Sequence, residues 1–200
     1  MQSLIDHARR FPALAAQRGV ELNRLAAGQH PQALFITCSD SRVVPALITG
    51  ARPGDLFELR TAGNIVPRHL PGQSCSEAAT IEYAVEVLGV RDIVVCGHSH
   101  CGAVGALVRG EDLTSIPAVR DWLKNADLRS TLSGSSTHPG PDVAEAVQQH
   151  VLIQLDRLHG FPAIARRLTG GELRLHAWFY EIHTGRVLAY RPSIGGFLPL

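Results

Sequence analysis

The chain has 200 residues, of which 45% are hydrophobic, so it is long enough to bury a full core, and one domain over residues 1–200 is expected. Acidic and basic residues nearly cancel to a formal charge of +1, which argues against a nucleic-acid partner or an anionic membrane surface. No apolar run approaches the roughly 18 residues of a membrane span, so the sequence predicts no transmembrane helix.

Residues 1–28 are expected to form an N-terminal helical arm. The segment carries several arginines but no apolar run before a small-residue cleavage site, so it does not resemble a secretory signal. A transit peptide is the alternative, and the acidic Asp6 and Glu21 argue against it. We expect an amphipathic helix in a cytoplasmic protein, whose four cysteines stay reduced.

Two short apolar runs predict the first strands. "ALFITC" (33–38) is typical of a buried strand, and "LFELRTA" (56–62) predicts a second strand after the turn signal "RPGD" (52–55). A helix is predicted over 74–89, with Ser74 and Glu77 as a capping box and Gly89 as its end. Its core face is expected to carry Ala78, Ile81, Val85 and Leu88, with Tyr83 off that face.

The remaining elements alternate between strands and helices. "DIVVCGH" (92–98) predicts a third buried strand, and 130–142 is rich in Ser, Gly and Pro and predicts a loop. Helices are expected over 103–110, 118–127 and 143–158, followed by a hairpin of 173–182 and 184–190 that turns at Thr184-Gly185. This order predicts an α/β fold: a mainly parallel central sheet flanked by helices, with an antiparallel piece near the end.

Potential metal ligands follow two of the predicted strands. Cys38 ends the first strand, His98 ends the third, and Cys101 lies in the turn that follows. In an open α/β sheet, ligands bind at the carboxyl ends of the strands, and a crossover can place these two ends side by side. Two cysteines and one histidine suit zinc. Three protein ligands with one open position are typical of a catalytic site, and four of a structural site.

"CSDSR" (38–42) adds two charged residues beside the first ligand. Alternate residues of an extended loop point the same way, so Asp40 and Arg42 can line one side with Cys38. A guanidinium can hold a carboxylate through two hydrogen bonds, which would keep Asp40 ionised and able to orient a zinc-bound hydroxide. The alternative is that Asp40 binds the metal as a fourth ligand and closes the site.

The other cysteines and one neighbouring histidine are expected to be structural or solvent-facing. Cys75 follows a helix start and Cys96 lies within a strand, so neither is predicted to bind metal. His100 is expected to point away from the side on which His98 and Cys101 lie.

"CSDSR" (38–42) and "GHSHCGA" (97–103), with "PGDLF" (53–57), "RTAGNIV" (60–66) and "EYAVEVLGV" (82–90), resemble the β-class carbonic anhydrases. The similarity covers about Leu25 to Tyr190, nearly the whole chain. It implies a zinc lyase, a carbonate dehydratase, that interconverts CO₂ and bicarbonate by zinc-hydroxide attack. It also implies one Zn²⁺ per subunit and self-association as a homodimer or homotetramer.

The resemblance assigns roles to particular residues. The motifs match Cys38, His98 and Cys101 to zinc ligands, and Asp40 with Arg42 to a catalytic dyad. The substrate pocket it implies, partly supplied by the partner chain, consists of Gln29, Phe57, Ala62, Tyr83 and Gly102. Thr61 stands where many members have Asn. Phe35 lies near a Trp of the members whose aspartate closes the site, which favours the open form here.

Three other functions could use a site of this kind. A nucleobase-deaminase-like site needs H-x-E and C-x-x-C, and neither is present around His98. A non-enzymatic structural zinc module needs a fourth ligand, for which Asp40 is the only good candidate. The same fold could also hydrolyse carbon disulfide or carbonyl sulfide, depending on access to the pocket.

Overall fold

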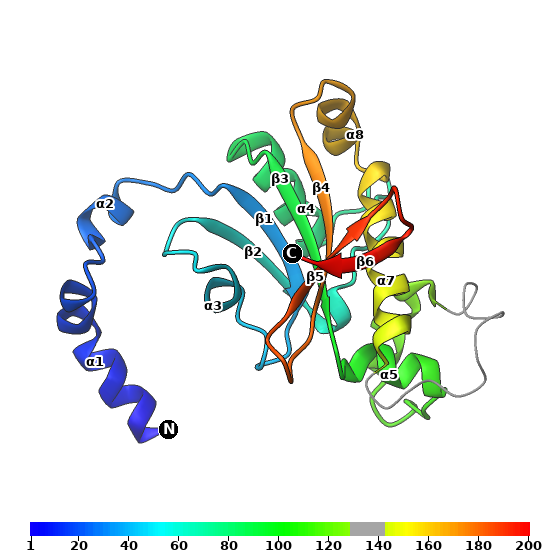
Figure 1. The fold of residues 1–200 in the computed structure, drawn as a ribbon, viewed down its shortest axis with the longest axis horizontal. Coiled ribbons are helices and arrows are strands. Elements are labelled where there is room, and N and C mark those ends of the chain that lie inside the picture. Colours follow the sequence, from blue (N-terminus) through cyan, green and yellow to red (C-terminus); the bar gives the residue numbers. More distant parts are fainter. Residues whose placement is uncertain (129–142) are drawn as a thin grey trace.

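The computed structural model describes residues 1–128 and 143–200, and a six-stranded sheet runs through these residues (Figure 1). Its strand order is β2-β1-β3-β4-β5-β6. The first four strands in this order are parallel to their neighbours, and the last two pair antiparallel. The strands are β1 (Ala33–Cys38), β2 (Leu56–Thr61), β3 (Asp92–His98), β4 (Arg174–Tyr180), β5 (Val187–Arg191) and β6 (Gly196–Pro199).

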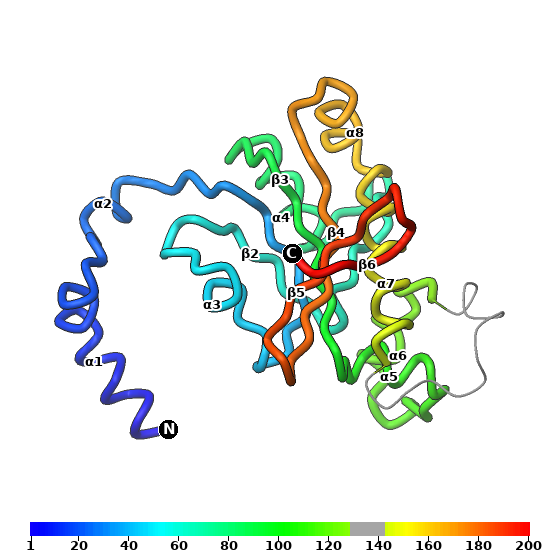
Figure 2. Tube along the Cα trace, in the orientation of Figure 1, coloured from blue at the N-terminus to red at the C-terminus, as the bar shows by residue number. Residues whose placement is uncertain are grey.

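Helices surround this sheet and extend from it. The α-helices are α1 (Gln2–Gln17), α2 (Leu22–Ala26), α3 (Pro45–Thr49), α4 (Ser76–Glu82), α5 (Gly102–Arg109), α6 (Pro117–Leu123), α7 (Ala144–Arg157) and α8 (Pro162–Thr169). Helix α4 continues as the π-helical turn η2 (Tyr83–Val87). The described residues also form the short 3₁₀ turns η1 (Ala62–Asn64), η3 (Lys124–Ala126) and η6 (Leu158–Gly160). Helices α1 and α2 stand apart from the sheet as an arm (Figures 1 and 2).

The main core lies between the sheet and the helices. Alternate residues of the parallel strands, such as Ile36, Val95 and Phe179, join one buried cluster with Val147 and Val151 of α7. The opposite strand positions form a smaller cluster of Phe35, Val94 and Cys96. Burial on both faces explains why β1 and β3 are continuous apolar runs rather than alternating ones.

Most of the predicted elements are confirmed. The three parallel strands and the antiparallel hairpin are present, and Gly185 has the positive φ of +73° that its turn requires. The capping box at Ser74 is wrong: Cys75 is the N-cap of α4, and no side chain caps this helix. Helices α3 and α8 and strand β6 were not predicted, and the predicted loop at 130–142 lies outside the described residues.

Among the described helices, none combines the length and the hydropathy needed to cross a membrane.

Candidate metal centre

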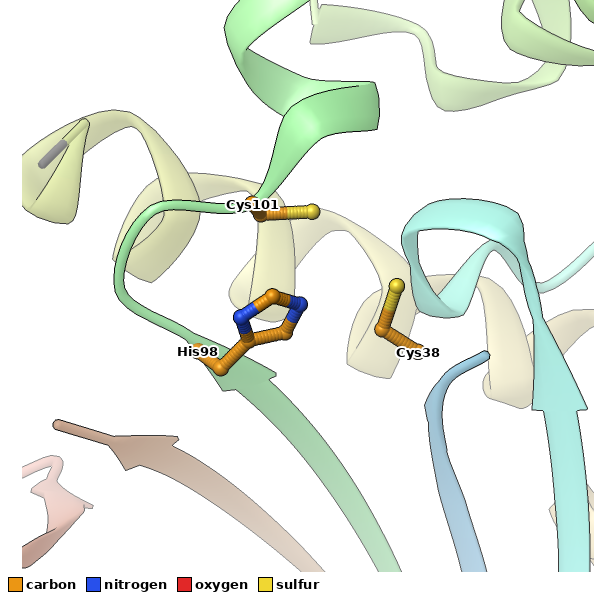
Figure 3. Close-up of side chains that lie close together, drawn as sticks. All are labelled: Cys38, His98 and Cys101. Carbon is orange, nitrogen blue, oxygen red and sulfur yellow. The ribbon is translucent and has the colours of Figure 1, made fainter. Parts of the chain in front are cut away.

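The adjacent strands β1 and β3 bring Cys38 and His98 to the same edge of the sheet. The strands pair in parallel, Cys38 is the last residue of β1, and His98 is the last residue of β3. Cys101 is the N-cap of α5, three residues beyond His98. The ligand atoms of these three side chains all lie within 4.8 Å of one another, and Figure 3 shows them converging. The structure therefore brings together the predicted zinc ligands.

The imidazole of His98 is held in the tautomer that a metal ligand needs. Its Nδ1 lies 2.8 Å from the carbonyl oxygen of Ser99, which can only accept a hydrogen bond, so Nδ1 carries the proton. Its Nε2 then presents a lone pair, which is fully buried and has no hydrogen-bond partner. A buried polar atom without a partner is costly unless something binds it, and a metal ion would do so.

The two sulfurs shift each other's pKa in opposite directions. A hydrogen bond from the thiol of Cys101, helped by the backbone N–H groups of Gly63 and Asp40, lowers the pKa of Cys38 to about 4. That same hydrogen bond, together with burial, raises the pKa of Cys101. The pair thus holds one thiolate and one thiol, and a dication can replace the remaining proton.

The spacing of the three ligand atoms fits zinc. Tetrahedral Zn²⁺ with bonds of roughly 2.0–2.3 Å separates its ligand atoms by about 3.5–3.8 Å. The three ligand atoms lie within 4.8 Å of one another, so a small movement of the side chains would bring them to these separations. Two thiolates and one neutral imidazole are a typical zinc donor set.

Asp40 and Arg42 form the pair that the sequence predicted. Arg42 donates from Nε to Oδ1 at 2.9 Å and from Nη2 to Oδ2 at 2.7 Å, and its backbone N–H also donates to Oδ1. These bonds hold the pKa of Asp40 well below its usual range. Oδ2 of Asp40 is 3.9 Å from Nε2 of His98, so an ionised carboxylate lies beside the candidate metal site.

Two further groups support Cys38 and were missed by sequence reasoning. Arg60 donates to the carbonyl oxygens of Cys38, Asp40 and Val43 at 2.7–3.0 Å and so holds the loop after β1. The backbone N–H of Gly63 donates to the sulfur of Cys38 at 3.3 Å. The position of Arg60 inside a predicted strand was a possible signal for its contacts with the loop after β1. No local pattern indicated the contact between the N–H of Gly63 and the sulfur of Cys38.

The residues predicted to bind substrate lie in two places. Ala62 follows the residue of β2 that pairs with Cys38, and Gly102 follows Cys101, so both lie at the metal-site edge. Phe57 lies four residues before Thr61 in β2, which places it roughly 13 Å from the metal-site edge along the strand. Its ring is 5.9 Å from that of Tyr83, which is 45% exposed.

Gln29 also lies at the end of the sheet opposite the metal site, since it precedes the first residue of β1. It lines a groove of about 610 Å³ together with residues of the arm and the 52–55 turn. Within one chain, the structure does not bring Gln29, Phe57 or Tyr83 to the metal site.

The residues expected to take no part in metal binding lie outside the cluster. Cys75 is exposed at the start of α4, and Cys96 is buried against the smaller core cluster. His100 is exposed, as expected, and its ring lies 6.3 Å from that of His183.

Comparison with known proteins adds independent evidence. The family model for carbonic anhydrase matches residues 33–187. A carbonic anhydrase of Pseudomonas aeruginosa is 45% identical over 203 residues, which cover all of this chain and 92% of that protein. One from Synechocystis is 44% identical over 99% of this chain and 74% of its own length.

Solved structures agree with these sequence matches. The β-carbonic anhydrase CcaA superposes with a TM-score of 0.93 at 42% identity, covering 100% of this chain and 99% of that one. A tetrameric β-carbonic anhydrase of Sordaria macrospora has a TM-score of 0.80 at 31% identity, covering 98% and 97%.

Proposed function

The chain belongs to the carbonic anhydrase family, in its β class, and on that premise we propose that it catalyses the reversible hydration of CO₂ to bicarbonate and a proton. The observation that carries the proposal is the convergence of Cys38, His98 and Cys101 beside the ionised Asp40. This arrangement would supply a metal site with three protein ligands and a hydrogen-bond acceptor next to it.

Cys38, His98 and Cys101 would hold one zinc ion per subunit. When bound, zinc supplies Lewis-acid chemistry that makes water a nucleophile near neutral pH. The chain contributes the donor set, the tautomer of His98 and a buried environment, since none of the three ligands is more than 6% exposed. Burial excludes bulk water and strengthens the electrostatic interactions within the site.

Asp40 would orient the nucleophile. Its Oδ2 faces His98, and an ionised carboxylate can accept the hydrogen of the attacking oxygen and so direct a lone pair toward CO₂. Arg42 engages both carboxylate oxygens, which supports an Asp40 that stays off the metal and an open site. A fourth protein ligand would instead make the site structural.

The remaining pocket residues would come from a second chain. Gln29, Phe57 and Tyr83 lie at the far end of their own sheet, so a homodimer could supply them to the partner's metal site, next to Ala62 and Gly102. The half-exposed aromatic ring of Tyr83 supports such an interface. We propose a homodimer or a homotetramer of such dimers, and the Sordaria macrospora relative is tetrameric.

A reducing compartment, the cytoplasm, is the proposed location. The candidate ligands Cys38 and Cys101 are free thiols about 4.8 Å or less apart, and oxidation of either would remove a metal ligand.

Zinc analysis combined with stopped-flow CO₂ hydration between about pH 6.5 and 9 tests the proposal. We expect one zinc per chain and rapid hydration. Stoichiometric zinc without hydration would overturn the enzyme and favour a structural zinc module. Hydrolysis of carbon disulfide or carbonyl sulfide in place of CO₂ hydration would assign the site to the other substrates.

A further inference from the structure

A buried histidine on α7 holds the turn that follows β2. His150 is fully buried, and its Nε2 lies 2.7 Å from the carbonyl oxygen of Gly63. Since a carbonyl oxygen can only accept, Nε2 carries the proton and donates it. The lone pair of Nδ1 then faces the side-chain amide of Gln154, whose nitrogen lies 3.4 Å away.

The amide of Gln154 fixes this tautomer. Its Nε2 also donates to the carbonyl oxygen of Ala126 at 3.1 Å, and its Oε1 accepts from the backbone N–H of Val66 at 3.0 Å. The amide therefore has only one orientation that satisfies all its partners, and in it the nitrogen faces His150. His150 and Gln154 of α7 thus hydrogen-bond to the segment after β2 at Gly63 and at Val66.

Gly63 connects this network to the metal site. Its carbonyl accepts from His150, while its N–H donates to the sulfur of Cys38 at 3.3 Å. The residue has a φ of +77°, and a Cβ added there would lie 3.0 Å from that of Ala103. Because one residue makes both contacts, holding its carbonyl restricts the direction of its N–H. Figure 3 shows the turn beside the sulfur of Cys38, with a helix behind the ligands.

We propose that His150 is a positioning residue for the metal centre: by holding the carbonyl of Gly63, it aims the N–H of Gly63 at the sulfur of Cys38. An N–H group pointed at a thiolate withdraws charge from the sulfur and keeps the side chain in its ligating orientation. This role rests on the metal site of the proposed function, and it does not require the CO₂ reaction.

Burial keeps His150 suited to this role. It lowers the pKa of His150 to about 4, so the ring is neutral at neutral pH and Nε2 remains its donor. In the part of the chain that the structure describes, the charged groups acting on it are Arg157 on the same helix and the sulfur of Cys38.

A pair of substitutions tests the role in the full-length chain loaded with cobalt or zinc. His150→Gln places an amide nitrogen where Nε2 lies, whereas His150→Asn is too short to reach Gly63. We expect His150→Asn to shift the sulfur-to-cobalt charge-transfer band to lower energy, because the thiolate has lost an N–H donor. We also expect a chelator to remove zinc roughly tenfold or more faster from this variant.

His150→Gln should restore both values toward those of the wild type. The matched control is Leu158→Ala, which removes a fully buried side chain just beyond α7 without touching the network. It should lower the thermal midpoint while leaving the band and the chelation rate unchanged. A wild-type band in His150→Asn, or an equal shift in Leu158→Ala, would overturn the proposal.

NMR of the wild-type chain provides a test that does not depend on a variant folding. With an NMR-active cadmium isotope in the site, we expect a scalar coupling between the metal and the Gly63 amide proton, and nitrogen shifts that place the proton of His150 on Nε2. A proton on Nδ1 would show the proposal to be wrong. The coupling reports on the metal–sulfur bond and the nitrogen shifts on the tautomer of His150, so a failure of the CO₂ reaction would leave both outcomes unchanged.

Discussion

Arg42 grips Asp40 through two parallel hydrogen bonds of 2.9 and 2.7 Å, and the carboxylate that it holds lies 3.9 Å from Nε2 of His98. Such a bidentate pair fixes both the charge and the orientation of the carboxylate. The pair links a surface arginine, whose side chain is 49% exposed, to a carboxylate that is 16% exposed beside the buried ligands.

Removing the charge of Asp40 should separate metal binding from catalysis. We expect Asp40→Asn to retain one zinc per chain and to lose about 10²–10⁴-fold in turnover, because an amide is a poor acceptor for the attacking oxygen. Metal analysis and stopped-flow hydration measure the two effects. Asp112→Asn, which alters a carboxylate outside the cluster, is the control, and a fully active Asp40→Asn would refute the role of Asp40.

Removing one of the metal-binding side chains should abolish both zinc binding and CO₂ hydration. Cys38→Ala and His98→Ala each leave two protein ligands, so we expect no stoichiometric zinc and no measurable hydration. Cys96→Ala and Cys75→Ala are matched controls, since neither cysteine belongs to the cluster. They should keep zinc and turnover, with a small loss of stability for the buried Cys96. Retention of zinc by Cys38→Ala would place the metal elsewhere.

A shared pocket should show complementation between two inactive chains. Cys38→Ala lacks the metal site, and Gln29→Ala lacks the proposed substrate contact. If each site combines the metal of one chain with Gln29 of the other, then co-expressed chains should recover about a quarter of the wild-type sites, because random pairing leaves half the dimers with one intact site. If activity does not exceed the sum of the two separate variants, each site is built within one chain.

His150 should make stability fall in acid. Its pKa is about 4 in the folded chain instead of the ordinary 6.5, because burial disfavours the charged ring. Between these values the unfolded chain binds a proton that the folded chain does not, so the free energy of unfolding decreases as the pH falls, by roughly 3 kcal/mol in total. Urea unfolding of the zinc-free wild type and of His150→Gln at several pH values measures the difference.

Wild-type stability should fall more steeply than that of His150→Gln between about pH 6.5 and 4. Parallel curves would contradict a buried, neutral His150.

Close packing under the third strand should make Gly97 intolerant of a side chain. A Cβ there would lie 2.5 Å from Val147 and 2.6 Å from Val151, both in α7. We expect Gly97→Ala to cost about 1–3 kcal/mol and to weaken zinc binding, because His98 is the next residue. Gly105→Ala is the control, since the atoms nearest its methyl would belong to the flexible end of Arg109. Equal free energies of unfolding for Gly97→Ala and Gly105→Ala would contradict this packing.

Much of the fold was predictable because its signals are local. The apolar runs of β1 and β3 are bounded by turns, and both begin and end at the predicted residues. The start of α4 was placed too early because Ser74 and Glu77 match a capping pattern that the chain does not use there. Helix α8 was missed although Pro162 begins it and Gly170 follows it, both of which are boundary signals. Strand β6 lacked a comparable pattern, since a strand depends on pairing, here with β5.

The sequence by itself determined the chemistry of the metal site: Cys38, His98 and Cys101 at two strand ends, with Asp40 and Arg42 alongside. Local order was sufficient there because strand ends and short loops fix where such side chains emerge. Only the tertiary structure decided that Gly63, held by His150 from 87 residues away, faces the sulfur of Cys38, and that Gln29, Phe57 and Tyr83 lie far from their own metal site. Contacts between distant segments depend on how helices pack on the sheet, and no periodicity in the chain encodes them.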